Sequence, residues 1–74
     1  MTKQEHERLS PILDKIKEKN YSAETALIMG SAIFSPKSID KIKTMDEIEK
    51  LLNESKNEKD FCEKIEPYTV NVNP

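Results

Sequence analysis

The sequence predicts an all-α fold: a compact bundle of four or five short helices with an extended C-terminal tail. Charged and apolar side chains recur at spacings of three and four along most of the chain, the period of an amphipathic helix. Residues 25–36 form the longest stretch without a charge in a chain that is 35% charged. Apolar residues nearly encircle this stretch, so we expect a central, largely buried helix that the other helices cover.

We expect the 74 residues to form a single small helical domain, because this length leaves no room for a second module. Such a domain buries only about 60% of the surface that its unfolded chain exposes. Its stability therefore depends on a compact core, on self-association or on a partner. One cysteine, Cys62, excludes an internal disulfide, and one distant histidine, His6, argues against a zinc site. We expect neither a metal nor another cofactor.

The free Cys62 and the lack of a recognisable signal sequence predict a reducing, cytoplasmic location. No apolar run approaches the roughly 20 residues that a membrane span requires, so we expect no membrane insertion. Lys, Glu and Ile are abundant, a usage that favours helix and resembles that of proteins encoded by AT-rich genomes. We expect a microbial or viral protein.

The first helix is expected over residues 11–19, because Ser10 can cap it and Pro11 suits the first helical position. It should end near residues 19 and 20. Its apolar face consists of Leu9, Ile12, Leu13 and Ile16.

Residues 1–9 contain a possible capping box, Thr2 with Glu5 three residues later. A helix that began there would meet Pro11, whose ring and missing N–H would kink it. We therefore expect residues 1–9 to be frayed or helical.

The central helix should be capped by Ser22, with Glu24 in its first turn. Leu27 is expected in the core. Gly30 in mid-helix costs about 1 kcal/mol relative to alanine, which predicts that another helix approaches closely against Ala26 and Gly30.

After Ser35 and Pro36, a short third helix should run to about residue 43 and bury Ile39 and Ile42. Thr44 and Glu47 then form the strongest capping box in the chain. It predicts a fourth helix over residues 45–55. The buried residues of that helix should be Met45, Ile48, Leu51 and Leu52.

A last helix is expected over residues 58–65, capped by Asn57 and stopped by Pro67. It should bury Phe61, Cys62 and Ile65. The tail, residues 68–74, then alternates apolar and polar side chains, which is the period of a strand. No second strand is predicted in this chain, so the tail should lie along the helices or pair with a strand of another molecule.

The charge is distributed unevenly along the chain, although the net charge is only −2. Residues 1–43 carry eight basic and six acidic side chains, and residues 44–74 carry four basic and eight acidic ones. This asymmetry predicts a polar partner surface or head-to-tail self-association, and an ordinary solvated helical surface is the alternative. The candidate partner-binding residues are Glu47, Glu54, Glu58, Tyr68, Val70 and Val72.

No catalytic residues are expected. Cys62 lies on the apolar stripe of its helix, where a free cysteine usually acts as a small hydrophobe. His6 lies among charges near the N-terminus. One glycine cannot form a glycine-rich phosphate loop. An enzyme is therefore not expected.

These features predict a small non-enzymatic regulator or inhibitor that binds another protein, or itself as a homodimer, through the acidic half and the tail. The alternative is a nucleic-acid-binding regulator with a degenerate helix-turn-helix in residues 22–43. Ala26 and Gly30 resemble the small-residue positions of that motif, but Ser31 stands where an apolar residue is expected. The recognition helix of this motif would begin at Pro36 and would offer Lys37 and Lys41 but no arginine to bind a guanine edge. Nucleic acid is therefore the less expected partner.

Overall fold

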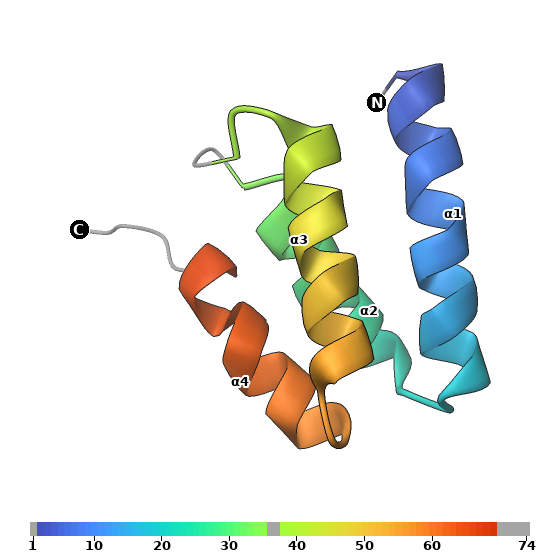
Figure 1. Ribbon diagram of the computed structural model, residues 1–74, viewed down its shortest axis with the longest axis vertical. Helices are drawn as coiled ribbons and strands as arrows, with labels where there is room; N and C mark the ends of the chain where they lie inside the picture. The colour runs from blue at the N-terminus through green and yellow to red at the C-terminus, as the bar shows by residue number, and fades with distance from the viewer. Residues whose placement is uncertain (1, 36–37, 70–74) are drawn as a thin grey trace.

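The computed structural model describes residues 2–35 and 38–69. This part of the chain folds into four helices: α1 (Lys3–Glu18), α2 (Ala23–Ile33), α3 (Lys41–Glu54) and α4 (Glu58–Thr69) (Figure 1). None of the described residues forms a strand. The predicted all-α class is therefore confirmed.

The helix at the centre of the arrangement is α3, which contacts each of the other three helices. Helix α1 packs along α3, whereas α2 packs against both α3 and α4 (Figure 1). Helix α2, whose one charged residue is Glu24, therefore covers α3 and α4 from one side and is not itself enclosed. This corrects the expectation that the uncharged stretch is the central helix.

All four helices contribute to a single hydrophobic core, and the removal of its apolar surface from water is the main force that stabilises the fold. The buried apolar residues are Ile12, Ile16, Met29, Ala32, Ile33, Met45, Ile48, Leu52, Phe61 and Ile65. Most of the core positions predicted from helical periodicity are in this set. Leu51 is half-buried against the set, and so is Leu9.

Several positions predicted on apolar, core-facing sides of helices are exposed instead. Leu27 is 72% exposed and Ile39 is 96% exposed. The predicted close approach of a helix at Gly30 is also wrong, because a Cβ built there meets no described atom within 4 Å. The errors at Leu27 and Gly30 have one cause. Helices α3 and α4 cover one side of α2, and the described residues supply no element that covers the other side.

Helix α1 begins at the capping box and passes through Pro11. The hydroxyl of Thr2 accepts from the backbone N–H of Glu5 at 3.1 Å, and the Glu5 carboxylate accepts from the N–H of Thr2 at 3.1 Å. The predicted start at residue 11 is therefore wrong. The turns before Pro11 are held by tertiary contacts, since Leu9 packs against the core and Arg8 pairs with α3.

The end of α1 agrees with the prediction. Asn20 has a positive φ of 59°, a conformation that asparagine tolerates better than most residues. Its N–H donates to the carbonyl of Lys17 at 3.0 Å, and the N–H of Tyr21 donates to the carbonyl of Ile16 at 3.1 Å. This hydrogen-bond pair is a Schellman motif, which places Tyr21 against Ile16.

Helix α3 begins at Lys41 and runs through Thr44 without a break. The separate helix predicted up to residue 43 and the predicted start at the box of Thr44 and Glu47 are both wrong. Asp40 provides the cap instead, and its carboxylate accepts from the N–H of Lys43 at 3.1 Å. The Thr44 hydroxyl, which is buried, donates to the carbonyl of Asp40 at 3.1 Å.

Helix α4 begins as predicted, because the side-chain oxygen of Asn57 accepts from the N–H of Asp60 at 2.8 Å. Its predicted end at residue 65, before Pro67, is wrong. The helix continues through Pro67 to Thr69, and Tyr68 in the last turn packs against the core. Residues 68 and 69 are thus helical and not extended, and the rest of the predicted tail lies outside the described residues.

Candidate protein-binding surface

The predicted partner-binding residues lie in different places. Glu47 and Glu54 are exposed on α3, whereas Glu58 starts α4 and Tyr68 lies near its end. The structure places Glu47 and Tyr68 beside each other, where both line one depression. Burial raises the pKa of Tyr68, and the Glu47 carboxylate adds to this effect. Val70 and Val72 lie outside the described residues.

Glu58 is engaged within the molecule. Its carboxylate accepts from the backbone N–H of Ser22 at 2.8 Å and from the Ser22 hydroxyl at 3.0 Å. It also accepts from the hydroxyl of Thr25. The Thr25 hydrogen bond, followed by the bond from the Ser22 backbone, lowers the pKa of Glu58. This side chain therefore holds Ser22, the N-cap of α2, and its role in partner binding stays a prediction.

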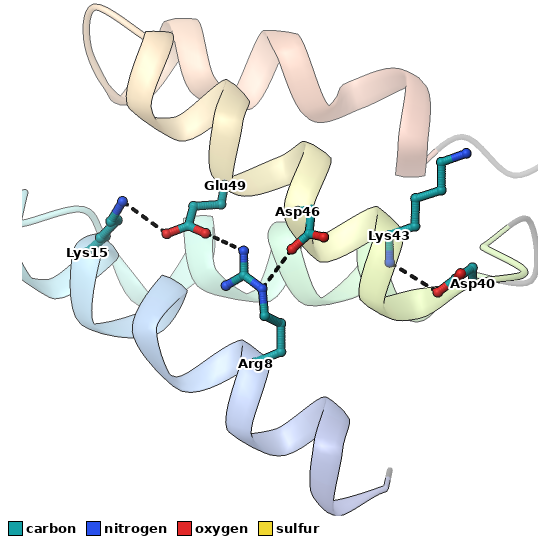
Figure 2. Close-up of polar contacts among 6 residues, drawn as sticks. All are labelled: Arg8, Lys15, Asp40, Lys43, Asp46 and Glu49. Atoms are coloured by element: carbon teal, nitrogen blue, oxygen red, sulfur yellow. Dashed lines mark hydrogen bonds and ion pairs between the residues drawn. The ribbon is translucent and has the colours of Figure 1, made fainter.

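Two of the four acidic residues of α3, Asp46 and Glu49, form ion pairs with α1 (Figure 2). The Arg8 Nε lies 2.7 Å from the Asp46 carboxylate, and a terminal nitrogen of Arg8 pairs with Glu49. Lys15 adds an ion pair to Glu49 at 3.0 Å and a hydrogen bond to Asn53 at 3.0 Å. The hydrogen bond from Arg8, with that from Lys15 next in size, holds the pKa of Glu49 below its usual value.

A further acidic residue of α4 is also paired. Lys64 Nζ lies 2.7 Å from the carboxylate of Asp60, which also accepts from the N–H of Lys56 at 3.0 Å. The hydrogen bond from Lys64 lowers the pKa of Asp60. The exposed acidic side chains of α3 and α4 without such an ion pair are Glu47, Glu54, Glu63 and Glu66.

The outer side of α2 presents an apolar line to solvent. Ala23, Leu27, Gly30 and Phe34 follow one another at spacings of four, three and four, which places them on one side of a helix. Leu27 is 72% exposed and Phe34 is 37% exposed. Phe34 directly follows α2, and its N–H continues the helical pattern by donating to the carbonyl of Gly30 at 2.9 Å. We call these four residues the α2 stripe.

A groove of about 510 Å³ lies between α1 and α2, next to this stripe. It exists because α1 is held against α3 and is joined to α2 through the turn at Asn20. Leu13 of α1, which is 39% exposed, lies on one side of the groove, and Ala23 and Ala26 of α2 lie on the other. Ile16 and Tyr21 also line it. We call this feature the α1–α2 groove; Ala23 belongs to both the groove and the stripe.

A second depression, of about 470 Å³, lies between α2 and α4 and includes Cys62. The Cys62 sulfur lies 3.6 Å from the hydroxyl oxygen of Thr25, and the residue is half-buried. His6 is exposed on the first turns of α1. The described residues contain no group of three or more His, Cys, Asp or Glu side chains that could hold a metal ion. Within the same residues, no helix is long and apolar enough to cross a membrane.

The α2 stripe was missed in the sequence because a helix that is apolar nearly all round is usually buried on all sides. A usable signal was present, however. Glu24 is the only charged residue of α2, and the residues at spacings of four, three and four alternate between small and large side chains.

No protein-family model matches this chain, and no curated protein or solved structure matches it either. A proposal for its function is therefore argued from the surface of the four described helices.

Proposed function

We propose that this chain is a small non-enzymatic regulator or inhibitor that binds another protein through the α2 stripe and the α1–α2 groove. The observation that supports this proposal is the exposure of Leu27, 72%, at the centre of an uncharged helix face. Burial of a leucine side chain is favourable by about 1.5–3 kcal/mol. An exposed apolar patch of this kind is typical of protein interaction sites.

The chemistry of the surface favours an amphipathic helix as the partner segment. Such a helix binds by laying its apolar face into a groove, with anchors every three or four residues. The α1–α2 groove is lined by apolar side chains, with Asp14 and Lys17 among its polar lining. Glu24 adds a negative charge at the start of α2. An apolar centre with a polar rim of both signs is the usual composition of a protein interface.

The acidic surface remains a second candidate for the same function. Glu47, Glu54 and Tyr68 would then contact a basic partner, as the charge of residues 44–74 suggests. This surface has less support than the α2 stripe, because Glu58 holds the N-cap of α2 and Glu49 is paired with α1.

A nucleic-acid-binding regulator is the alternative function, with less support still. A helix-turn-helix joins its two helices by a turn of about three or four residues. Here residues 34–40 separate α2 from α3, which is a longer connection. Lys41, the first residue of α3, donates to the carbonyl of Ser38 at 3.0 Å, and its Nζ lies 5.8 Å from the centre of the Phe34 ring.

Capture experiments with three immobilised chains test the proposal: wild type, Leu27→Asp and Glu54→Lys. We expect the wild type and Glu54→Lys to retain a partner protein from a nuclease-treated lysate of the source cells, and Leu27→Asp to lose it. Because Leu27 is exposed, the melting temperature of Leu27→Asp should stay close to that of the wild type.

The other outcomes are equally informative. Loss of capture by Glu54→Lys with retention by Leu27→Asp would transfer the function to the acidic surface. Salt-dependent binding of mixed DNA and RNA fragments, weakened by Lys41→Glu, would favour the nucleic-acid alternative.

A further inference from the structure

We propose that the helix bound by the α2 stripe is α2 of a second copy of this chain, in antiparallel orientation. The inference depends on the proposed function, because it assigns a partner to the same surface. The order of side chains along the stripe, the free space at Gly30 and the charges at the two ends of the stripe support it independently.

The first support is the order of side-chain sizes. Along the stripe, small and large residues alternate: Ala23, Leu27, Gly30 and Phe34. When two such helices pack antiparallel about a two-fold axis midway along the stripe, Leu27 faces Gly30 of the second copy. Ala23 then faces Phe34 of the second copy. Every large side chain meets a small one, so both copies fill each other's gaps, as a two-fold interface requires.

A parallel pair has no such complementarity. Leu27 would meet Leu27, Phe34 would meet Phe34, and a gap would remain between the two glycines. The spacing of four, three and four residues is that of the seam in a coiled coil, where a side chain of one helix inserts between residues of the other. The sequence order of the stripe therefore specifies the antiparallel orientation.

The second support is the space at Gly30. A Cβ built at this residue meets no described atom within 4 Å, so the outer side of α2 is open at this point. Glycine in a helix interior lowers helix stability. The open side provides the recess that an incoming leucine side chain needs. The requirement for close approach at Gly30 is thus met by a second copy and not by this chain's own helices.

The third support is the charge at each end of the stripe. Glu24 lies in the first turn of α2, beside Ala23. Lys41 lies at the other end, with its Nζ 5.8 Å from the centre of the Phe34 ring. An antiparallel pair places Glu24 of each copy near Lys41 of the other, which is complementary at both ends. A parallel pair would place like charges together.

The size of the surface predicts a weak dimer. Helix α2 has 11 residues and is therefore about 16 Å long. A stable interface usually buries more than about 1,200 Å² in total, which one short helix pair does not reach without contributions from the rim, such as Leu13. We expect dissociation in the micromolar range, with a monomer at high dilution.

Sedimentation over a wide concentration range tests the dimer directly. The wild type should pass from monomer to dimer, and Leu27→Asp should raise the dissociation constant roughly tenfold or more. Ile39→Asp is the matched control, because Ile39 is 96% exposed but lies outside the stripe, and it should still dimerise. Gly30→Leu should also lose the dimer, while its monomer melts at or above the wild-type temperature because the site is open.

Cross-linking tests the orientation. In a Cys62→Ser background, chains with Leu27→Cys are mixed with chains with Gly30→Cys and oxidised. A disulfide needs Cα atoms about 4.4–6.8 Å apart. If the pair is antiparallel, the mixture should form a disulfide-linked dimer, and either variant alone should form much less of it. Efficient cross-linking of Leu27→Cys chains by themselves would overturn the antiparallel orientation.

A wild-type chain that stays monomeric at all concentrations would overturn self-association. The proposed function would survive that result if Leu27→Asp still abolished capture of a different protein. A dimer that Leu27→Asp and Gly30→Leu both leave intact would place the contact elsewhere and would also overturn this inference.

Discussion

Glu58 holds the N-cap of a helix to which it does not belong. It is the first residue of α4, and its carboxylate accepts hydrogen bonds from Ser22 and Thr25 at the start of α2. The first N–H groups of a helix have no partner within the helix, and the helix dipole favours a negative charge there. The Ser22 hydroxyl accepts from the N–H of Thr25 at 3.3 Å, and the Glu58 carboxylate in turn binds Ser22. Glu58 thus anchors the N-cap of α2 to the start of α4, although Ser22 and Glu58 are 36 positions apart.

This arrangement predicts an acid-sensitive fold. The pKa of Glu58 is lowered from 4.5, chiefly by the Thr25 hydrogen bond, so its stabilising effect is present above pH 4.5 and is lost as the pH falls through the lowered pKa. The melting temperature should therefore fall on acidification. Glu58→Gln should melt lower at neutral pH and should show a shallower acid dependence, as measured by circular dichroism.

Glu54→Gln is the matched control for this measurement, because Glu54 is exposed and should leave the acid dependence unchanged. Some dependence should remain in Glu58→Gln, since the pKa values of Glu49 and Asp60 are also lowered. An acid dependence in Glu58→Gln as steep as in the wild type would contradict the assigned role.

At the scale of elements, two helices of this protein continue through a proline. Pro11 lies inside α1 and Pro67 inside α4. A proline in a helix interior removes one backbone hydrogen bond and costs about 3 kcal/mol. Around Pro11 the cost is offset by the capping box of Thr2 and by the tertiary contacts of Arg8 and Leu9.

Pro11→Ala should therefore stabilise the protein. Because α1 runs through an exposed Pro11, alanine restores the missing N–H and should raise the free energy of unfolding by about 1–3 kcal/mol. Urea denaturation measures this change. Pro11→Gly should gain about 1 kcal/mol less than Pro11→Ala. If a separate helix began at Pro11, proline would already suit its first position, and neither variant would be more stable than the wild type.

At the scale of the whole molecule, α1 is attached to the rest through α3. Arg8 bridges Asp46 and Glu49 of α3, and Lys15, about two turns further along α1, adds an ion pair to Glu49 (Figure 2). Arg8 lies in the part of α1 before Pro11. The same contacts set the position of α1 relative to α2 and hence the shape of the α1–α2 groove.

Arg8→Ala should loosen α1 selectively. The change leaves Asp46 without its ion pair and Glu49 with Lys15 alone, and we expect a loss of about 1–2 kcal/mol, the range of a partly exposed charge-assisted hydrogen-bond pair. Hydrogen exchange should accelerate more in α1 than in α4, because local opening is controlled by local contacts. Exchange that accelerates equally in both helices would contradict this local role.

Two controls accompany that experiment. Arg8→Lys should recover only part of the loss, since an ammonium group cannot bridge two carboxylates as the planar guanidinium does. Lys50→Ala, on the exposed side of α3, should change the free energy of unfolding by less than about 0.5 kcal/mol.

The sequence by itself determined the all-α class, most of the core and several helix boundaries. Amphipathic periodicity identified Ile12, Ile48 and Phe61 as buried, and the caps at Ser22 and Asn57 were recognised as such. These features are predictable because each depends on residues within one or two helical turns. The partner-binding residues stay a prediction, and the intramolecular contacts of Glu58 could not be read from local sequence because Ser22 lies 36 positions away.

Only the tertiary structure decided whether a local signal was used and which helix face was covered. Pro11 is a local signal for a helix start, and it was outweighed by the contacts of Arg8 with α3, which lie 38 or more positions away. The capping box at Thr44 was not used because Asp40 caps the helix one turn earlier. A helix such as α2, with Glu24 as its one charged residue, lacks a continuous polar side that would mark its outer face. The positions of α3 and α4 alone leave Leu27 in solvent, and that exposure is the basis of the proposed binding surface.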